Sequence, residues 1–486
     1  MEDNAATVDV AELLRAGRFA EARTALAEVT TPSALLERVR VHFHFSEYVD
    51  AERAARAAAA ATDDPAVRSL AHTMVKAAQA GQGLPDESPL DIEDLQGREL
   101  SASLYYVAVA AYWRHDFRAV DAWLSTHAPK DPVLRARYLI LRGFAAAGAG
   151  DVAKHLEFSD AAARILRAEA PEEVYLLASV AFVMALLLRE LPWQGHEYIE
   201  ELEQQLPWPP DLEMWRFHIL RGIGWKRALS GAYLDAMRYL LEATLHTGDG
   251  IRRAYALLDR ASIAIFANER VTASSEFTVA VGILDSIDWK TVKDETLLVL
   301  PYAAQVAAEL NDSLHARRFF ELAARLRGGI DPRWAFAHGE RFDAFLSEAA
   351  AFTFYDSKRK RAIREAERAY EIFARIGYAW RAGRLAVLLY SATHDVDWHA
   401  RAEEWLGYYP NSPLQRLLPG KSARRKTVRP LSPRQREVFR LMRQGKTGTE
   451  IAAELGISTL TVRNHEQAVM RYYKVHRRYD LRQMAE

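Results

Sequence analysis

A helical pattern broken by short turns recurs along most of this chain, and it constrains the fold more than any other feature. Each copy has a helical run, a Gly, Asn or Asp turn, and then an aromatic residue followed by small residues. No alternation of apolar and polar residues persists long enough to predict a strand. The turns are expected near Gly17, Ser46, Asp116, Gly150, Gly231 and Asn311.

The spacing of these turns predicts stacked helical hairpins. The interval from Asp116 to Gly150 is 34 residues, and later intervals are longer. Such a period is typical of tetratricopeptide repeats, in which each hairpin buries its apolar face against its neighbours. We therefore predict an all-α, tetratricopeptide-like solenoid of about ten hairpins. Small residues at Ala22, Ala51 and Ala236 let paired helices approach, and the spaces between hairpins are filled by Tyr48, Phe117, Tyr233 and Phe319.

The last 56 residues, 431–486, have a different organisation. Ser432 is a good N-cap before Pro433, and Gly445 ends the helix that they begin. The stretch from Thr447 to Glu450 has the spacing of a capping box, and Ser458 caps a further helix that runs to about Tyr473. Two helices joined by a short turn containing Gly predict a helix-turn-helix unit, whose second helix enters a major groove.

This segment resembles the LuxR/FixJ-type DNA-binding domain of bacterial transcription regulators. The resemblance implies a small four-helix domain that binds double-stranded DNA as a homodimer and usually activates transcription through RNA polymerase. The combination with helical repeats resembles MalT-like activators, without their nucleotide-hydrolysing module. The matching residues are Leu431, Ser432, Arg434, Arg436, Glu437, Val438, Gly445, Glu450, Ile451, Ala452, Leu455, Ile457, Ser458, Thr461, Val462, Arg463, His465, Val469, Val475, Arg478 and Leu481.

The second helix of this unit is expected to contact the bases. Arg463, Asn464 and Gln467 share an outward face at i, i+1 and i+4, while Leu460 and Val462 point inward. Arginine pairs well with guanine, and asparagine or glutamine with adenine. The matching positions of related domains also contact bases. Phosphate contacts are predicted for Lys446, Thr447, Thr449, Ser458, Thr461 and Arg471.

Charge and proline content divide the chain into three parts. We predict a helical-repeat domain at 1–408, a linker at 409–430 with four prolines, and the DNA-binding domain at 431–486. From Pro419 onward there are 16 Lys or Arg against 6 Asp or Glu, a balance of +10, which leaves −11 on residues 1–418. A basic arm that attracts phosphates is expected at Arg424, Arg425, Lys426 and Arg429.

A group of aromatic and arginine side chains in the solenoid is a candidate surface for a ligand or protein partner. Such residues stack on planar or anionic ligands, although tryptophan at helical spacing is more often part of the core between repeats. The sequence does not identify the inducer. The group consists of Trp208, Trp215, Arg216, Arg221 and Trp225.

Several classes of function are excluded by residues that the sequence lacks. There is no cysteine, so disulfides, thiolate catalysis and cysteine-bound metals are ruled out. The longest uncharged run, Val174 to Leu188, has 15 residues, fewer than the roughly 20 of a membrane span, so we predict a buried helix there. His42 and His44 point to different helix faces, and the group between His394 and His399 is expected in a solvated turn. We therefore expect a soluble, cytoplasmic protein with no metal, cofactor or catalytic site.

Two hypotheses remain. In the first, the protein is a transcription regulator, an activator by resemblance, whose solenoid senses a ligand or partner and whose C-terminal domain binds a twofold-symmetric operator. The opposite charges of the two parts motivate a masking mechanism, in which the acidic solenoid holds the basic tail until a ligand releases it. In the second, the protein is an interaction scaffold, and its helix-turn-helix unit is a tether or a docking module.

Overall fold

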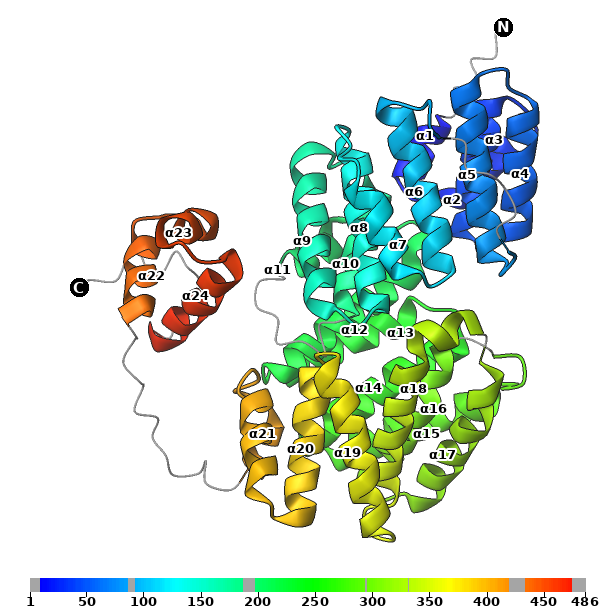
Figure 1. The fold of residues 1–486 in the computed structure, drawn as a ribbon. Helices are drawn as coiled ribbons and strands as arrows, with labels where there is room; N and C mark the ends of the chain where they lie inside the picture. The colour runs from blue at the N-terminus through cyan, green and yellow to red at the C-terminus, as the bar shows by residue number, and fades with distance from the viewer. Residues whose placement is uncertain are drawn as a thin grey trace, which may run out of the picture. The chain divides into compact units, whose positions relative to one another are not determined.

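The chain folds into two compact units, Met1–Leu418 and Pro419–Glu486. The computed structural model describes residues 9–85, 92–186, 197–292, 295–330, 332–418 and 433–473. Within these ranges every regular element is helical, with 24 α-helices and four short 3-10 helices (Figure 1). The predicted all-α fold is confirmed. None of the described helices has both the length and the apolar character that a bilayer crossing requires.

The first unit begins with eleven α-helices (Figure 1). They are α1 (Val10–Arg15), α2 (Phe19–Leu26), α3 (Pro32–His44), α4 (Tyr48–Ala60), α5 (Pro65–Gly81), α6 (Gly97–Trp113), α7 (Phe117–Ser125), α8 (Pro132–Gly148), α9 (Val152–Glu169), α10 (Val174–Ala185) and α11 (Glu197–Gln205).

A second series completes the first unit, and three helices form the second unit. The series is η1 (Pro210–Leu212), α12 (Glu213–Leu229), α13 (Tyr233–Leu245), α14 (Gly250–Phe266), α15 (Arg270–Asp285), η2 (Glu295–Leu298), α16 (Val299–Glu309), α17 (Ser313–Leu326), η3 (Arg327–Gly329), α18 (Pro332–Thr353), α19 (Arg359–Arg375), α20 (Ala379–Thr393), α21 (Val396–Leu406) and η4 (Pro413–Leu417). The second unit contains α22 (Pro433–Arg443), α23 (Gly448–Leu455) and α24 (Thr459–Tyr473).

One turn geometry closes most of the hairpins. At Asn311 the backbone is left-handed, with φ of 66°. Its N–H donates to the carbonyl of Ala308 at 3.0 Å, and the N–H of Asp312 donates to the carbonyl of Ala307 at 2.9 Å. This pair of bonds is the Schellman motif, which satisfies carbonyls at the end of a helix. The same pair of bonds occurs at Gly17, Ser46, His115, Gly150, Gly231, Asn268 and Gly377.

Five of the six predicted turns therefore lie at the expected residue. At the sixth, the left-handed residue is His115, and Asp116 instead caps α7 by accepting from the Ala119 amide at 3.0 Å. The sequence analysis did not predict the turns at Asn268 and Gly377, which have the same backbone geometry.

Two of the aromatic residues predicted to fill the spaces between hairpins, Tyr48 and Phe117, pack on glycines of the next hairpin. A Cβ atom placed on Gly148 would lie 2.4 Å from Phe117 Cζ, and one on Gly81 would lie 2.5 Å from Tyr48 Cδ1. The rings therefore occupy space that any larger side chain would need. Ala22, Ala51 and Ala236 are completely buried. Close contact between small residues and large rings holds neighbouring hairpins together.

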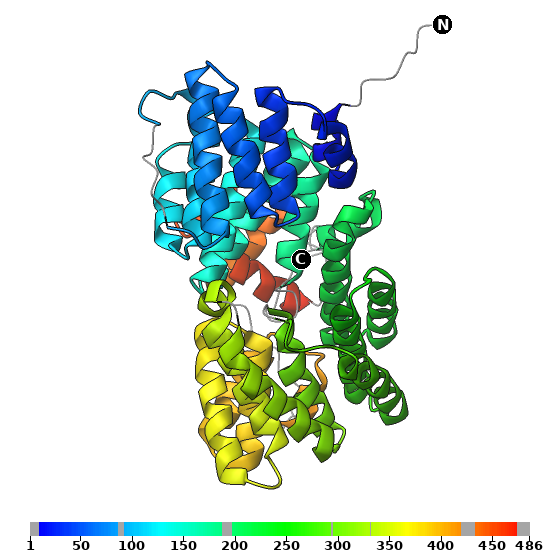
Figure 2. The same ribbon diagram turned by 90° about the vertical axis from the view of Figure 1, so that its right-hand side faces the viewer.

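The described part of the uncharged run is mostly a buried helix, as predicted, and Leu186, after its end, is exposed. α10 begins at Val174, and most of its side chains have little or no exposure to water. Its interior position explains why the run carries no charge, since a charged side chain there would lose its hydration. In Figure 2 the earlier helices, blue to cyan, stack above the later helices, which are yellow.

The array formed by the first eleven helices curves so far that the turn between α1 and α2 contacts η1. The carboxylate of Asp211 accepts a hydrogen bond from the Ala20 amide at 2.8 Å. Leu212 is completely buried, and a Cβ on Gly17 would lie 2.5 Å from its Cδ1 atom. α1 also contacts α10. The α1–α2 turn and η1 therefore close one turn of the helical array.

The packed part of the first unit continues past the last long helix. Tyr409, Leu414 and Leu418 are buried in the same apolar cluster as α20. Ser412 is also buried and caps η4 by accepting from the Leu414 amide at 3.2 Å. The first residues of the segment expected to be a linker thus pack on the helical unit.

Candidate nucleic-acid interface

The turn between α23 and α24 follows from local capping. Thr447 Oγ1 accepts from the Glu450 amide at 3.3 Å, and Glu450 Oε2 accepts from the Thr447 amide at 2.7 Å. This is the predicted capping box. Gly456 ends α23 with φ of 62°, a conformation that other residues adopt only with strain.

The next helix is also capped by a side chain. Ser458 Oγ accepts from the Thr461 amide at 3.0 Å, and the two hydroxyl oxygens are 2.8 Å apart. Ser458 is exposed and Thr461 half-buried. Both side chains lie at the start of α24, where free amides and the helix dipole attract anions. Their capping role is compatible with the predicted phosphate contacts.

An apolar core joins the three helices and orients α24. Val462 and Val469 are completely buried on α24 and lie about two turns apart on the same face. They pack with residues of α22 and α23, so rotation of α24 about its axis would expose apolar surface. The remaining fully or largely buried members of the core are Val438, Leu441, Met442, Ile451 and Ala452.

The predicted base-contacting residues lie on the other side of α24. Arg463 and Asn464 are exposed, and Gln467 is half-buried. At 100° per residue, these three positions face away from Val462. The structure thus brings them together on one outward face, in agreement with the geometry that base recognition requires.

The other predicted phosphate contacts have different surroundings. Thr449 is exposed on the first turn of α23, and Thr447 is held in the capping box. Lys446 forms an ion pair with Glu454. The side chain of Arg471 lies outside the described residues. α22 also exposes Arg436 and Arg440, four residues apart, which the sequence analysis did not propose as contacts although their spacing places them on one helix face.

A comparison with known families agrees with this geometry. Residues 429–485 match the family described as bacterial regulatory proteins, luxR family. The second unit is a LuxR-type helix-turn-helix domain. No curated protein matches the chain.

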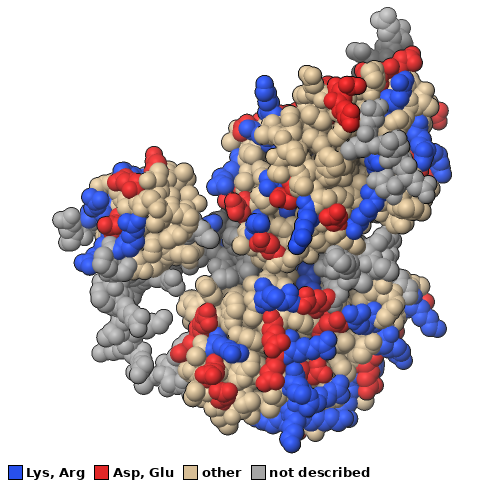
Figure 3. Space-filling view, viewed as in Figure 1, with Lys and Arg blue, Asp and Glu red and all other residues tan. Residues whose placement is uncertain are grey.

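The match gives α22–α24 a DNA-binding role and does not extend to the helical array. The basic arm at Arg424, Arg425, Lys426 and Arg429 lies outside the described residues, as do residues 474–486, where the resemblance implies the fourth helix of the domain. On the first unit, Figure 3 shows positive and negative side chains interspersed over the visible surface.

The five residues proposed as a ligand or partner surface have separate surroundings. Trp225 is 2% exposed and belongs to the core. Arg221 binds the buried carboxylate of Asp259 at 2.6 Å, and its guanidinium lies 4.2 Å from the centre of the Tyr255 ring.

The other three residues also have protein partners. Arg216 binds Glu203 at 2.8 Å, and the Trp208 indole N–H donates to the carbonyl of the same residue at 2.8 Å. Trp215 stacks on Phe182 with ring centres 5.7 Å apart. These contacts join α10, α11 and α12, and they account for the aromatic pattern by packing between hairpins.

Among the described residues, one group has ligand atoms close enough for a metal ion. His42, Glu47 and Asp50 each offer one atom, all within 4.8 Å of one another. Arg23 binds Glu47 at 3.0 Å, however, and Arg53 binds Asp50 at 2.7 Å. Both carboxylates are thus neutralised by the protein, and the group is a network of ion pairs.

The histidine group near the end of the helical array forms a turn, as predicted. His394 ends α20 in the left-handed conformation with φ of 58°, and Asp395 caps α21 by accepting from the Asp397 amide at 2.9 Å. His399 packs against Tyr390, with ring centres 5.1 Å apart. The carboxylate and imidazole groups are therefore used in capping and packing.

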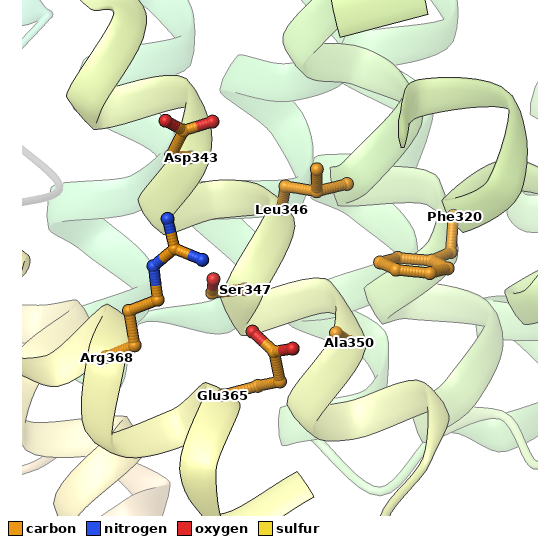
Figure 4. Close-up of a pocket in the computed structure, with 7 residues that line it drawn as sticks. All are labelled: Phe320, Asp343, Leu346, Ser347, Ala350, Glu365 and Arg368. Carbon is orange, nitrogen blue, oxygen red and sulfur yellow. The ribbon is translucent and has the colours of Figure 1, made fainter. Parts of the chain in front are cut away.

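A pocket of about 120 Å³ lies between α17, α18 and α19. Figure 4 shows Asp343 and Arg368 toward one side of it and Phe320 toward the other. Arg327 binds Asp343 at 2.6 Å, so this carboxylate already has a partner. The volume is below that of ordinary ligand pockets, which begin at roughly 300 Å³.

Proposed function

We propose that this protein is a transcription regulator that binds DNA through the outward face of α24. The observation that supports the proposal most strongly is the position of Arg463 and Asn464. They are exposed on a helix whose opposite face is buried, within a segment that matches the luxR family. Two such side chains can distinguish base pairs by their hydrogen-bonding edges.

We further propose that the protein binds as a homodimer to a twofold-symmetric operator and activates transcription through RNA polymerase. The resemblance of the C-terminal segment to LuxR-type domains supports this part of the proposal. Dimers place two reading helices about one DNA turn apart, so the operator should have two half-sites at that spacing. The helical array is proposed to be a tetratricopeptide-like sensor, and the protein is expected to act in the cytoplasm.

The experiment that tests this function is selection of genomic DNA fragments by the purified full-length protein at two salt concentrations. We expect the retained fragments to share a twofold-symmetric sequence, because base contacts remain when salt weakens the contacts to phosphates. The Arg463→Ala, Asn464→Ala double variant should retain fragments without a shared sequence. The matched control is Arg364→Ala, which removes an exposed arginine from α19 of the helical array and should select the same sequence as the natural protein.

Selection of unrelated sequences by the natural protein at both salt concentrations would contradict the proposal. In that case the alternative, an interaction scaffold with a helix-turn-helix tether, would be favoured. The two functions also differ in the effect of the double variant on protein partners. A scaffold should keep its partners when Arg463 and Asn464 are replaced, since neither residue would belong to the scaffold's binding surface.

A further inference from the structure

The pocket of about 120 Å³ between α17, α18 and α19 has two chemically different sides. Its lining residues on α18 recur at i, i+3, i+4 and i+7, so they share one face of that helix. α19 contributes two residues at i and i+3, and α17 contributes one aromatic ring. The lining consists of Asp343, Leu346, Ser347 and Ala350 of α18, Glu365 and Arg368 of α19, and Phe320 of α17.

Contacts across the three helices fix the walls of this pocket. Arg327, directly after α17, donates to the two carboxylate oxygens of Asp343 at 2.6 and 2.8 Å. The guanidinium of Arg361 on α19 lies 5.6 Å from the centre of the Phe320 ring, and this ring packs edge-on against Phe354 with ring centres 5.3 Å apart. The walls are therefore held in place by protein contacts and need no ligand to form.

Each carboxylate of the pocket has an arginine of its own. Asp343 is bound by Arg327, and Glu365 has Arg361 at 4.0 Å, one helical turn earlier. Arg368 differs from these residues. It is exposed at the pocket and, among the described residues, forms no ion pair and no side-chain hydrogen bond. The pocket and the arginines bound to it therefore have one uncompensated positive charge, which is that of Arg368.

Ser347 is a second lining residue whose polar group has no protein partner. The residue is only 4% exposed, although its side chain lines the pocket. In the described part of the chain its hydroxyl makes no hydrogen bond. Buried hydroxyls usually bind protein, water or a ligand. Figure 4 shows the Ser347 hydroxyl and the Arg368 guanidinium on one side of the pocket and the Phe320 ring on the other.

The volume of the pocket limits a ligand to a few heavy atoms. A cavity of about 150 Å³ can hold benzene, so a volume of about 120 Å³ holds about five heavy atoms. Nucleotides, sugars and peptides are too large to be enclosed there. The ligand must also present an apolar part to Phe320, Leu346 and Ala350, since these side chains offer no hydrogen bonds.

We propose that this pocket binds a short-chain monocarboxylate of the class of acetate, propionate and butyrate. The guanidinium of Arg368 donates to the carboxylate, and the Ser347 hydroxyl donates to one of its oxygens. The aliphatic chain lies against Phe320, Leu346 and Ala350, where its contact with water is reduced.

The charges and the apolar wall select this class over other small ions. One carboxylate matches the one uncompensated guanidinium. A doubly charged phosphate would bring excess negative charge next to Asp343 and Glu365, and it has no apolar part for the opposite wall. A small ammonium ion would be repelled by Arg368 and would find both carboxylates already neutralised by arginines.

The test is binding of propionate to the full-length protein, measured by ligand-observed NMR. Propionamide and propylammonium serve as comparisons because they keep the apolar chain and change the charge, and phosphate tests a purely ionic site. We expect propionate to bind about tenfold or more tightly than each of these compounds, because hydrogen bonds to a charged group are stronger than neutral ones. Its affinity should be modest, since so few atoms make few contacts.

Two results of this measurement would overturn the proposal. One is the failure of acetate, propionate and butyrate alike to bind. The other is tighter binding of propylammonium or phosphate than of propionate, which would make the pocket a site for cations or for inorganic anions.

Substitutions locate the binding site. Arg368→Gln should weaken propionate binding by about tenfold or more, and Ser347→Ala should weaken it by about three- to tenfold. The matched controls are Arg364→Gln and Ser357→Ala, which change exposed residues outside the pocket lining and should bind as the natural protein does. Equal affinity in Arg368→Gln and the natural protein would exclude the site.

Folding is controlled separately. Each variant should have the helicity of the natural protein, and Arg368→Lys, which keeps the charge but loses the paired donors, should bind with intermediate affinity. A loss of binding in Arg368→Gln that Arg368→Lys does not partly restore would contradict a direct contact with the carboxylate.

A role of the carboxylate as the inducer rests on the proposed function, whereas binding itself does not. Affinity for the selected DNA should therefore be measured with and without propionate. A change in DNA affinity that Arg368→Gln abolishes would support regulation through this pocket. Propionate binding with unchanged DNA affinity would leave the site in place and contradict ligand control of transcription.

Discussion

The side-chain carboxylate of Asp211 accepts a hydrogen bond of 2.8 Å from the backbone amide of Ala20, a residue 191 positions earlier in the chain. Next to it, the buried side chain of Leu212 packs on Gly17. Hairpins of a solenoid normally contact only their neighbours in sequence. This closure adds long-range contacts and should make the first eleven helices unfold more cooperatively than an open array.

Gly17→Ala is predicted to destabilise the closure, and Gly83→Ala is its matched control. Both glycines have a left-handed backbone, with φ of 77° and 75°, so both substitutions add similar backbone strain. A Cβ on Gly17 would lie 2.5 Å from Leu212, whereas Gly83 has no neighbour within 4 Å. We expect Gly17→Ala to cost about 1–3 kcal/mol more than Gly83→Ala. Denaturant unfolding of the two variants measures the difference, and equal losses would show that the contact with Leu212 is not tight.

The closure is predicted to weaken in acid because of His44. Burial lowers the pKa of His44 to about 4, and the nearby Asp211 only partly offsets this effect. The unfolded chain therefore takes up a proton at higher pH than the folded protein, and stability should fall as pH decreases from about 6.5 toward 4. His44→Phe keeps a ring to stack on Phe19, whose ring centre is 3.9 Å away, and removes the titration. Melting temperatures from pH 7 to 4.5 should fall less in this variant, and parallel curves would rule out the effect.

Glu173 is predicted to affect the pH dependence of stability in the opposite direction to His44, and Glu173→Gln tests this effect. Burial raises the pKa of the Glu173 carboxyl, while Arg137, Arg40 and Arg15 oppose the rise. Because the pKa of this carboxyl is higher in the folded protein than in the unfolded chain, stability decreases as the pH rises from the unfolded pKa to the folded pKa. The variant should thus be more stable than the natural protein at pH 7 and lose this advantage below about pH 4. A variant that is less stable at pH 7 would show that the carboxylate has a stabilising partner.

Breaking the ion pair between Arg381 and Glu348 is predicted to cost far more than breaking an exposed pair. Their side chains are 2% and 1% exposed, and the Arg381 guanidinium also lies 4.0 Å from the centre of the Phe345 ring. Glu348→Gln leaves a buried positive charge without its carboxylate, at a cost of about 3–5 kcal/mol. The control is Glu340→Gln, which breaks a pair with Arg375 that is 57% and 58% exposed, and should cost at most about 1 kcal/mol. Denaturant unfolding of both variants measures these costs, and similar losses of unfolding free energy would contradict the prediction.

Two substitutions in the DNA-binding domain are predicted to have different effects, one on discrimination between DNA sequences and the other on overall affinity. Asn464→Ala should reduce discrimination at one base position of each half-site by about 1–3 kcal/mol. Lys446→Ala should weaken binding to all sequences and lower the salt slope of the binding constant by about one unit per half-site. Titrations of operator and altered-operator DNA at several salt concentrations separate the two effects. A uniform loss of affinity in Asn464→Ala would mean that this residue does not read a base.

The sequence by itself determined the features that depend on near neighbours. The turns at Gly17 and Asn311, the capping box from Thr447 to Glu450, and the face shared by Arg463 and Asn464 all arise from contacts within a few residues. Helical periodicity and backbone hydrogen bonds encode them locally, so short segments of the chain are enough to predict them. The buried helix α10 was also predictable, because a long apolar run without charged residues is most stable when it is buried.

Only the tertiary structure decided which distant residues meet. Asp211 and Ala20 contact each other because small rotations between successive hairpins add up over many helices, and no short pattern records that sum. Packing between hairpins, rather than the spacing of tryptophans, also decided that Trp225 lies in the core. Whether a side chain is buried, paired or left facing water depends on this long-range arrangement, and so does the chemistry that we propose for the helical array.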